Sequence, residues 1–227
     1  MWNTKVAFYN SAYQEYSIFN FMMVDLATGP WWVGRQDIVK CPVGYKEQYY
    51  SSERLSHVFH VDPTYEHYFN RNFSLKGSYS LSKEFYYNTD NASLDNNNYR
   101  YEISPNIYLF DRRHMISAAA GFEDHNADGR RFSYDAYYYA LSYLTKFPTG
   151  TEFFLRYMWT GRDYKEKPLL YSEYRKDRKR NVTAVLSQEF LKNFFASFAF
   201  SFTDNNSNAS LYEFEKTTYT ANVGFKF

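Results

Sequence analysis

Five segments of this chain alternate between apolar and polar side chains with a period of two residues. In the last of them, one stripe is formed by Tyr219, Ala221, Val223, Phe225 and Phe227, and the other by Thr218, Thr220, Asn222, Gly224 and Lys226. Comparable runs begin at Phe73, Ile116, Phe153 and Phe194. Successive side chains of a β-strand point to opposite faces of its sheet. Each run therefore predicts a strand with one apolar and one polar face.

Two kinds of all-β protein produce this alternation, a soluble sandwich of two sheets and a transmembrane barrel. The runs have roughly ten residues, the length of a strand that crosses a bilayer. Aromatic residues make up 22% of the chain, as expected of a barrel with an apolar outside and aromatic rings at both membrane interfaces. The mean hydropathy of −0.64 also fits, because every second residue of such a barrel faces its lumen. We therefore expect a barrel.

The connections between the predicted strands alternate between short and long. Short turns are expected at residues 69–72, 111–113, 147–150 and 191–193, and long polar loops at residues 88–98, 124–131, 163–177 and 204–216. Outer-membrane barrels have short periplasmic turns and long extracellular loops. The pattern therefore predicts that both termini lie in the periplasm and that the long loops lie outside the cell.

The first third of the chain predicts four further strands near residues 3–12, 18–28, 36–48 and 55–67, with a turn at residues 29–35. Pro42, Pro63 and Pro105 fall inside predicted strands, where proline removes a donor from the hydrogen-bond ladder, so we expect bulges or barrel rims there. The predicted fold is all-β: a closed, antiparallel, up-and-down transmembrane β-barrel of about twelve strands. Residues 1–227 would form one multi-pass domain of the bacterial outer membrane. The barrel-assembly machinery would bind the C-terminal strand, which presents Tyr219, Val223, Phe225 and Phe227 on its apolar stripe.

The stripes opposite the apolar ones contain charged residues that would face the lumen: Lys40, Lys46, Asp62, Glu66, Lys76, Glu84, Glu102, Glu123 and Arg156. In one interpretation they line a polar conduit that guides a passenger. In the other, facing charges pair and fill a narrow barrel, so that buried ions are compensated. We expect pairing, because a barrel of about twelve strands has a small interior.

A basic run enters a predicted strand after the longest loop: Arg175, Lys176, Arg178, Lys179 and Arg180. Arg and Lys bind phosphate groups well, so the run is a candidate contact for lipopolysaccharide at the outer leaflet. The alternative is a solvated base of the loop.

No other chemistry is predicted. His57, His60 and His67 do not share one strand face, so we expect no metal site, and we expect no cofactor. No serine or cysteine nucleophile is predicted beside a base, so we do not expect an enzyme. The formal net charge of +1 argues against a nucleic-acid partner, which requires a basic patch.

Three segments near the C-terminus resemble a known family. They are Phe132-Ser133-Tyr134-Asp135, the basic run at 174–180, and the loop Asn206-Ser207-Asn208-Ala209-Ser210-Leu211-Tyr212 that ends in Glu215-Lys216. They resemble the closing hairpins of the surface lipoprotein assembly modifier family, whose barrels follow tetratricopeptide repeats. The resemblance implies the outer-membrane barrel of a surface lipoprotein assembly or secretion system, with outer-membrane lipid and a surface lipoprotein as partners.

That resemblance also implies a periplasmic repeat domain before the barrel. The sequence has no helical repeat with a period near ~34 residues, so we expect the chain to be the C-terminal part of a longer protein. The alternative functions are a small stand-alone porin or channel and a structural anchor of the outer membrane.

Overall fold

The computed structural model describes residues 1–227 except 12–19, 169–170, 191–193 and 226–227. In this part the chain forms one antiparallel sheet of fourteen strands. The strands are β1 (Trp2–Ser11), β2 (Phe21–Val33), β3 (Asp37–Lys40), β4 (Val43–Tyr50), β5 (Glu53–Val61), β6 (Thr64–Asn70), β7 (Phe73–Tyr86), β8 (Asn96–Leu109), β9 (His114–Ala127), β10 (Tyr134–Lys146), β11 (Thr151–Tyr164), β12 (Lys176–Phe190), β13 (Phe194–Ser207) and β14 (Phe214–Phe225). Three short 3-10 helices lie between them: η2 (Thr89–Leu94), η3 (Arg130–Phe132) and η4 (Ser210–Tyr212). None of the helices in these residues is long and apolar enough to cross a membrane.

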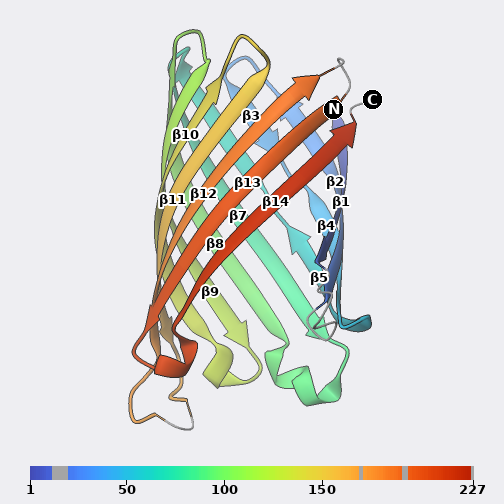
Figure 1. The fold of residues 1–227 in the computed structure, drawn as a ribbon, viewed down its shortest axis with the longest axis vertical. Coiled ribbons are helices and arrows are strands. Elements are labelled where there is room, and N and C mark those ends of the chain that lie inside the picture. Colours follow the sequence, from blue (N-terminus) through green and yellow to red (C-terminus); the bar gives the residue numbers. More distant parts are fainter. Residues whose placement is uncertain (12–19, 169–170, 191–193, 226–227) are drawn as a thin grey trace.

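From β7 to β14 each strand pairs with the next one along the chain. The sheet curls round on itself, so that β11–β14 lie in front of β7–β9 in Figure 1. Within the described residues, pairing runs from β1 to β14 and does not join these two end strands to each other. The predicted all-β, antiparallel architecture is confirmed, and closure of the sheet into a barrel stays a proposal.

The two ends of the curled sheet differ. Figure 1 shows η2, η3, η4 and the connection from β11 to β12 at one end, and the turns after β6, β8 and β10 at the other. We call these the long-loop end and the short-turn end. The tight turn between β4 and β5 also lies at the long-loop end, beside η2, because Ser56 pairs with Tyr86. The turn between β8 and β9 has three consecutive residues with positive φ, namely Phe110, Asp111 and Arg112. The turn between β10 and β11 contains Gly150 at φ +82°, a conformation that glycine adopts without steric cost.

The two faces of the sheet differ as the alternation predicts. One face, which we call the polar face, contains the buried side chains of Ser56, Ser74, Ser104, Asn106, Thr160 and Asn205. The opposite, apolar face contains exposed side chains such as Tyr219 and Val223, which are 66% and 77% exposed. The difference arises because alternate side chains of a strand point to opposite sides.

The structure has fourteen strands, so the prediction of about twelve is wrong. Two predicted runs are each divided at a proline: Pro42 separates β3 from β4, and Pro63 separates β5 from β6. Proline has no backbone N–H to give to the ladder. The register on β2 is the same on both sides of the first break, since Thr28 pairs with Val43 and Trp31 with Lys40.

Several predicted boundaries also need correction. Residues 29–33 continue β2 rather than forming a turn, and only residues 34–36 connect β2 to β3. The strands also extend into all four predicted long loops, because polar residues continue the pairing there. The added strand residues are 96–98, 124–127, 163–164, 176–177, 204–207 and 214–216. Pro105 lies within β8, where the pairing with β9 is interrupted. The predicted turn at 191–193 and Phe227 lie outside the described residues.

Candidate functional site

The register places eight of the nine charged residues predicted to face the lumen on the polar face. They are Lys40, Lys46, Glu66, Lys76, Glu84, Glu102, Glu123 and Arg156. The ninth, Asp62, lies between β5 and β6 and bonds Ser80 and His60 of the same face. The expected pairing among the nine is not present in the described structure. Of the nine, only Asp62 and Glu102 take part in ion pairs, and their partners are His60 at 2.6 Å and Arg100 at 3.6 Å.

Neutral donors hold two of the other carboxylates on the polar face. Glu84 accepts hydrogen bonds from Gln48 at 2.9 Å, Ser56 at 2.7 Å and Asn96 at 3.2 Å. Glu66 is held in the same way by the hydroxyl of Ser74 at 2.6 Å and by two further polar side chains. Such bonds fix a carboxylate without neutralising its charge. Neither carboxylate forms an ion pair with a described residue, although Lys76 lies opposite Glu66 in the register.

The cations of this set are held only weakly. Lys40 lies over the Trp31 ring, 4.4 Å from its centroid. Arg156 contacts the Met158 sulfur at 3.9 Å. Neither Lys46 nor Lys76 has an ion pair with any described residue. A counter-charge for these side chains would have to come from a ligand or from solvent.

The three histidines considered as metal ligands lie apart. His60 is held on the polar face between Asp25 at 3.0 Å and Asp62 at 2.6 Å. His67 bonds Asp37 at 2.7 Å on the apolar face, and His57 stacks on Phe85 there, with ring centroids 5.2 Å apart. Among the described residues no group of three His, Cys, Asp or Glu is placed to hold a metal ion.

The long-loop end contains a buried ion pair that the sequence analysis did not predict. The Arg175 guanidinium donates two hydrogen bonds to Asp177, at 2.9 Å and 2.6 Å. It also lies over two aromatic rings, 4.2 Å from the centroid of Tyr164 and 3.4 Å from that of Tyr212. Asp177 is only 1% exposed. The pair therefore fixes the start of β12 against η4.

Hydrogen bonds join neighbouring long connections into one rim. Gly129 before η3 donates its backbone N–H to Ser93 of η2 at 2.8 Å. The connection after β11 donates from Lys165 N to the Ser133 carbonyl at 2.9 Å. Burial opposes protonation of Lys165, but hydrogen bonds to Asp124 and Asp135 outweigh it and raise the pKa of the ammonium. Lys165 therefore stays charged and holds this part of the rim.

The rim continues from the connection after β11 to η4. The Asn208 side chain accepts from the backbone N–H of Lys176 at 2.7 Å and donates to the Tyr174 carbonyl at 2.9 Å. Leu211 N donates to the Tyr171 hydroxyl at 3.3 Å. Four connections far apart in sequence are thus held together.

A hollow of about 480 Å³ lies within this rim. We call it the rim pocket, and its lining is Arg131, Phe132, Pro168, Tyr171, Arg175, Leu211 and Tyr212. Leu211 is 73% exposed. The rim pocket brings together the three segments on which the family resemblance was based. An exposed apolar and aromatic hollow with arginines at its edge is suited to non-covalent recognition of another molecule.

The basic run at 174–180 does not form one patch. Arg175 is bound to Asp177, and Lys179 lies on the polar face. Arg178 and Arg180 lie on the apolar face, 3.3 Å from Asp163 and 3.9 Å from Asp204. The run divides because residues of a strand alternate between faces, and only Lys176 continues into the exposed surface near the rim.

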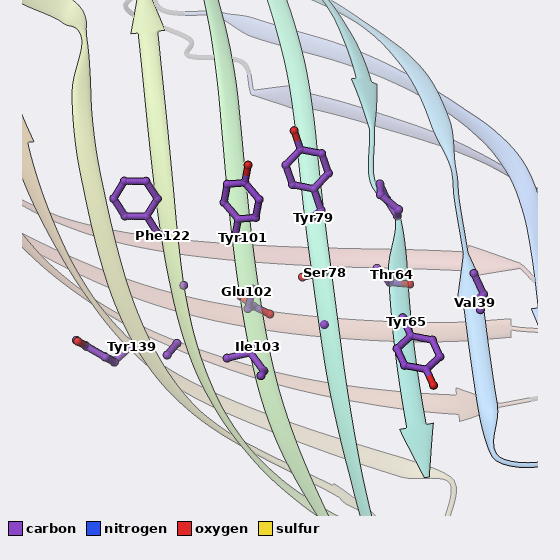
Figure 2. A pocket seen from close by; sticks show the side chains of 14 residues that line it. Val39, Thr64, Tyr65, Ser78, Tyr79, Tyr101, Glu102, Ile103, Phe122 and Tyr139 are labelled. Carbon is purple, nitrogen blue, oxygen red and sulfur yellow. The ribbon is translucent and has the colours of Figure 1, made fainter.

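A second, larger hollow of about 770 Å³ lies on the apolar face. Figure 2 shows the rings of Tyr79, Tyr101 and Phe122 in one row and the side chains of Tyr65, Ile103 and Tyr139 in another. Its floor is open because a Cβ added at Gly77 would meet no atom within 4 Å. The hollow belongs to the apolar face of the sheet.

The comparisons agree with this architecture. A family model described as surface lipoprotein assembly modifier matches residues 2–227. The chain belongs to the surface lipoprotein assembly modifier family. The resemblance inferred from the three segments is thereby confirmed. A comparison with curated proteins finds no match.

Solved outer-membrane barrels share the fold of this family member. KdgM porin is 16% identical over 100% of this chain and 99% of its own, with a TM-score of 0.50. The β-domain of a Bordetella autotransporter is 10% identical over 99% of this chain and 95% of its own, with a TM-score of 0.51. At such identities the likeness concerns the fold alone. Together with the family, it supports an outer-membrane location for this chain, and the family and these neighbours are barrel- and porin-type proteins rather than enzymes.

Proposed function

We propose that this chain is the membrane-embedded part of a system that assembles or secretes surface lipoproteins, and that its rim pocket contacts the passenger. The observation that supports this proposal is that the three segments on which the family resemblance was based all line the rim pocket. The contact would be non-covalent, because within the described residues no serine or cysteine is bonded to a histidine.

In this proposal the sheet closes into a multi-pass barrel with the polar face inside, so that its nine charged residues line the lumen. The long-loop end then faces outside the cell, and the termini face the periplasm. Arg178 and Arg180 on the apolar face would contact lipopolysaccharide phosphates at the outer leaflet. The barrel-assembly machinery would bind the C-terminal strand with Tyr219, Val223 and Phe225.

The test is display of a lipoprotein on cells that lack the native protein, measured with an antibody on intact cells. Leu211→Glu places a charge in the rim pocket without disturbing a buried contact. Burial of a leucine side chain contributes about 1.5–3 kcal/mol, so we expect display to fall by roughly 10- to 100-fold. Wild-type protein that restores no display would refute the proposal.

Phe110→Glu is the matched control. Phe110 is 75% exposed, as Leu211 is 73% exposed, but it lies in a short turn. We expect this variant to display the lipoprotein as the wild type does. Equal loss in both variants would remove the rim pocket from the proposal.

The second candidate function is a passive channel. The observation in its favour is the charge on the polar face, where Lys46, Lys76 and Arg156 have no ion pair with any described residue. Stable single-channel conductance of the purified protein in planar bilayers, together with unchanged lipoprotein display in cells that lack it, would favour the channel.

A further inference from the structure

The polar face of β11–β14 contains four cations, Arg156, Arg162, Lys179 and Lys216. They lie in four successive rows of register partners. Arg156 shares a row with Thr183, and Lys216 lies in the next row, opposite Thr203. Lys179 follows in the row of Thr160, and Arg162 in the row of Asp177. We call these four side chains the cation ladder.

The cation ladder is only partly compensated within the described structure. Within β11–β14, Asp177 is the one carboxylate in its four rows, and this carboxylate already binds Arg175. The row of Arg162 continues across β10 to Glu123 on β9, which accepts a hydrogen bond from Tyr134 and forms no ion pair with the ladder.

The Nε atoms of Arg156 and Arg162 are buried without a hydrogen-bond partner. None of the four cations has an ion pair with a described residue. Arg156, Arg162 and Lys179 are half-buried and Lys216 is exposed. Unpaired charge that is partly buried is costly, so an anion that enters this face would be favoured.

The side chains between the cations are small and polar. The rows include Asn181, Thr183, Ser201, Thr203 and Thr218. Hydroxyl and amide groups both donate and accept hydrogen bonds. They can therefore form hydrogen bonds with the backbone N–H and C=O groups of a chain that lies along the strands.

We propose that the cation ladder binds an extended acidic segment of the passenger polypeptide. Successive rows are two residues apart, about 6.6 Å. Alternate side chains of an extended peptide have the same spacing, since each residue rises about 3.3 Å. The cations lie on β11, β12 and β14, and neighbouring strands are about 4.8 Å apart. A peptide that lies over β12 and β13 and has an acidic residue at every second position would present one carboxylate to each row, and the long side chains on β11 and β14 would approach it from either side. That the bound anion is a polypeptide, rather than another acidic polymer, rests on the proposed function.

The ladder leads toward the rim pocket. Arg162 shares its row with Asp177, whose partner Arg175 lines that pocket. An extended chain could therefore contact both sites at once. The outside of β11–β14 is apolar, with Leu155, Leu186 and Phe198 exposed, so the ladder is reached from the polar face.

The experiment uses the purified full chain in detergent and measures fluorescence anisotropy of labelled peptides of about ten residues, enough to span about 33 Å when extended. One peptide alternates Glu and Ser, and a second has the same composition with its Glu residues in a single block. We expect the alternating peptide to bind at least about threefold more tightly. Binding should weaken as salt rises, because exposed charges are screened.

Lys179→Gln/Lys216→Gln tests the ladder, and Lys46→Gln/Lys76→Gln is its control with the same change of charge on β4 and β7. None of the four lysines has an ion pair with a described residue, so both variants should fold. We expect about tenfold weaker peptide binding for the ladder variant and less than about twofold for the control. A larger variant, with Arg156→Gln and Arg162→Gln added, should abolish binding.

Several outcomes would overturn the proposal. Equal loss in both variants would indicate non-specific attraction. Equal affinity for the two peptides would remove the spacing argument. Binding of an acidic oligosaccharide such as oligogalacturonate with no binding of either peptide would assign the ladder to sugars. Because lipoprotein display is measured separately in cells, failure of the ladder is distinguishable from failure of the proposed function.

Discussion

Asp177 is a buried residue at the long-loop end of the sheet. Its carboxylate is almost completely buried and accepts two hydrogen bonds from Arg175, while the Tyr164 hydroxyl lies 3.3 Å away. A buried charge is tolerated when it is paired, and removal of one partner leaves the other uncompensated. This one contact therefore holds Arg175 at the rim pocket.

We expect Asp177→Asn to lower the free energy of unfolding by about 3 kcal/mol, because the Arg175 charge loses its partner. Urea unfolding in detergent micelles, followed by tryptophan fluorescence, would measure the loss. Asp135→Asn is the control, since Asp135 pairs with Lys165 at 3.1 Å but its side chain is 51% exposed. A loss as large in the control as in Asp177→Asn would contradict this account.

Two strand glycines have opposite surroundings. A Cβ at Gly29 would lie 2.2 Å from the Cys41 carbonyl oxygen, whereas one at Gly77 would meet no atom within 4 Å. We expect Gly29→Ala to destabilise the protein by about 1–3 kcal/mol, because backbone must move. Gly77→Ala should be neutral or stabilising by up to about 1 kcal/mol, since alanine has less freedom when unfolded. The same urea titration measures the free energy of unfolding of both variants. An equal change in Gly29→Ala and Gly77→Ala would show that the clash at Gly29 is absent.

The two prolines that divide strands have no backbone N–H to donate, but their own carbonyl groups still accept hydrogen bonds from neighbouring segments of the chain. Pro42 O accepts from Asp62 N at 3.0 Å, and Pro63 O accepts from Tyr79 N at 3.0 Å. Gly29 faces the first break, which explains why this position lacks a side chain. The two strands of each divided run therefore lie end to end beside the same neighbouring strand: β3 and β4 pair with β2, and β5 and β6 pair with β7.

The connection after β11 is fixed to η4 by the Asn208 side chain. We expect Asn208→Ala to remove two hydrogen bonds worth roughly 1–2 kcal/mol together. The backbone amide of Lys176 should then exchange with deuterium roughly tenfold faster. Asn206→Ala is the control, since among the described residues the Asn206 side chain hydrogen-bonds only the nearby Asp204, at 3.3 Å and 3.4 Å. Unchanged exchange at Lys176 would show that other contacts hold the rim.

The arrangement of the molecule in the membrane follows from the two unlike ends of the sheet. In a Cys41→Ser background, we expect a membrane-impermeant maleimide to label Leu211→Cys on intact cells. It should label Phe110→Cys only after the outer membrane is permeabilised, because the short turns would face the periplasm. Labelling of Phe110→Cys on intact cells would reverse the proposed orientation.

Much of the architecture was predictable because strand periodicity is a local property. Alternation at 218–227 and at the other four runs assigned one apolar and one polar stripe to each strand. The long and short connections also placed η2, η3 and η4 at one end. The strand number was not predictable, because whether Pro42 or Pro63 divides a run depends on its neighbours in the sheet.

By itself the sequence determined the all-β antiparallel class, the family, and the two faces of the five alternating runs, since these follow from covalent geometry and from local motifs. Only the tertiary structure decided which residues meet. It placed Tyr212 on Arg175, divided the basic run between two faces, and arranged Arg156, Lys216, Lys179 and Arg162 in successive rows. The physical reason is that contacts across strands depend on register, which is set by pairing along whole strands and not by any one segment.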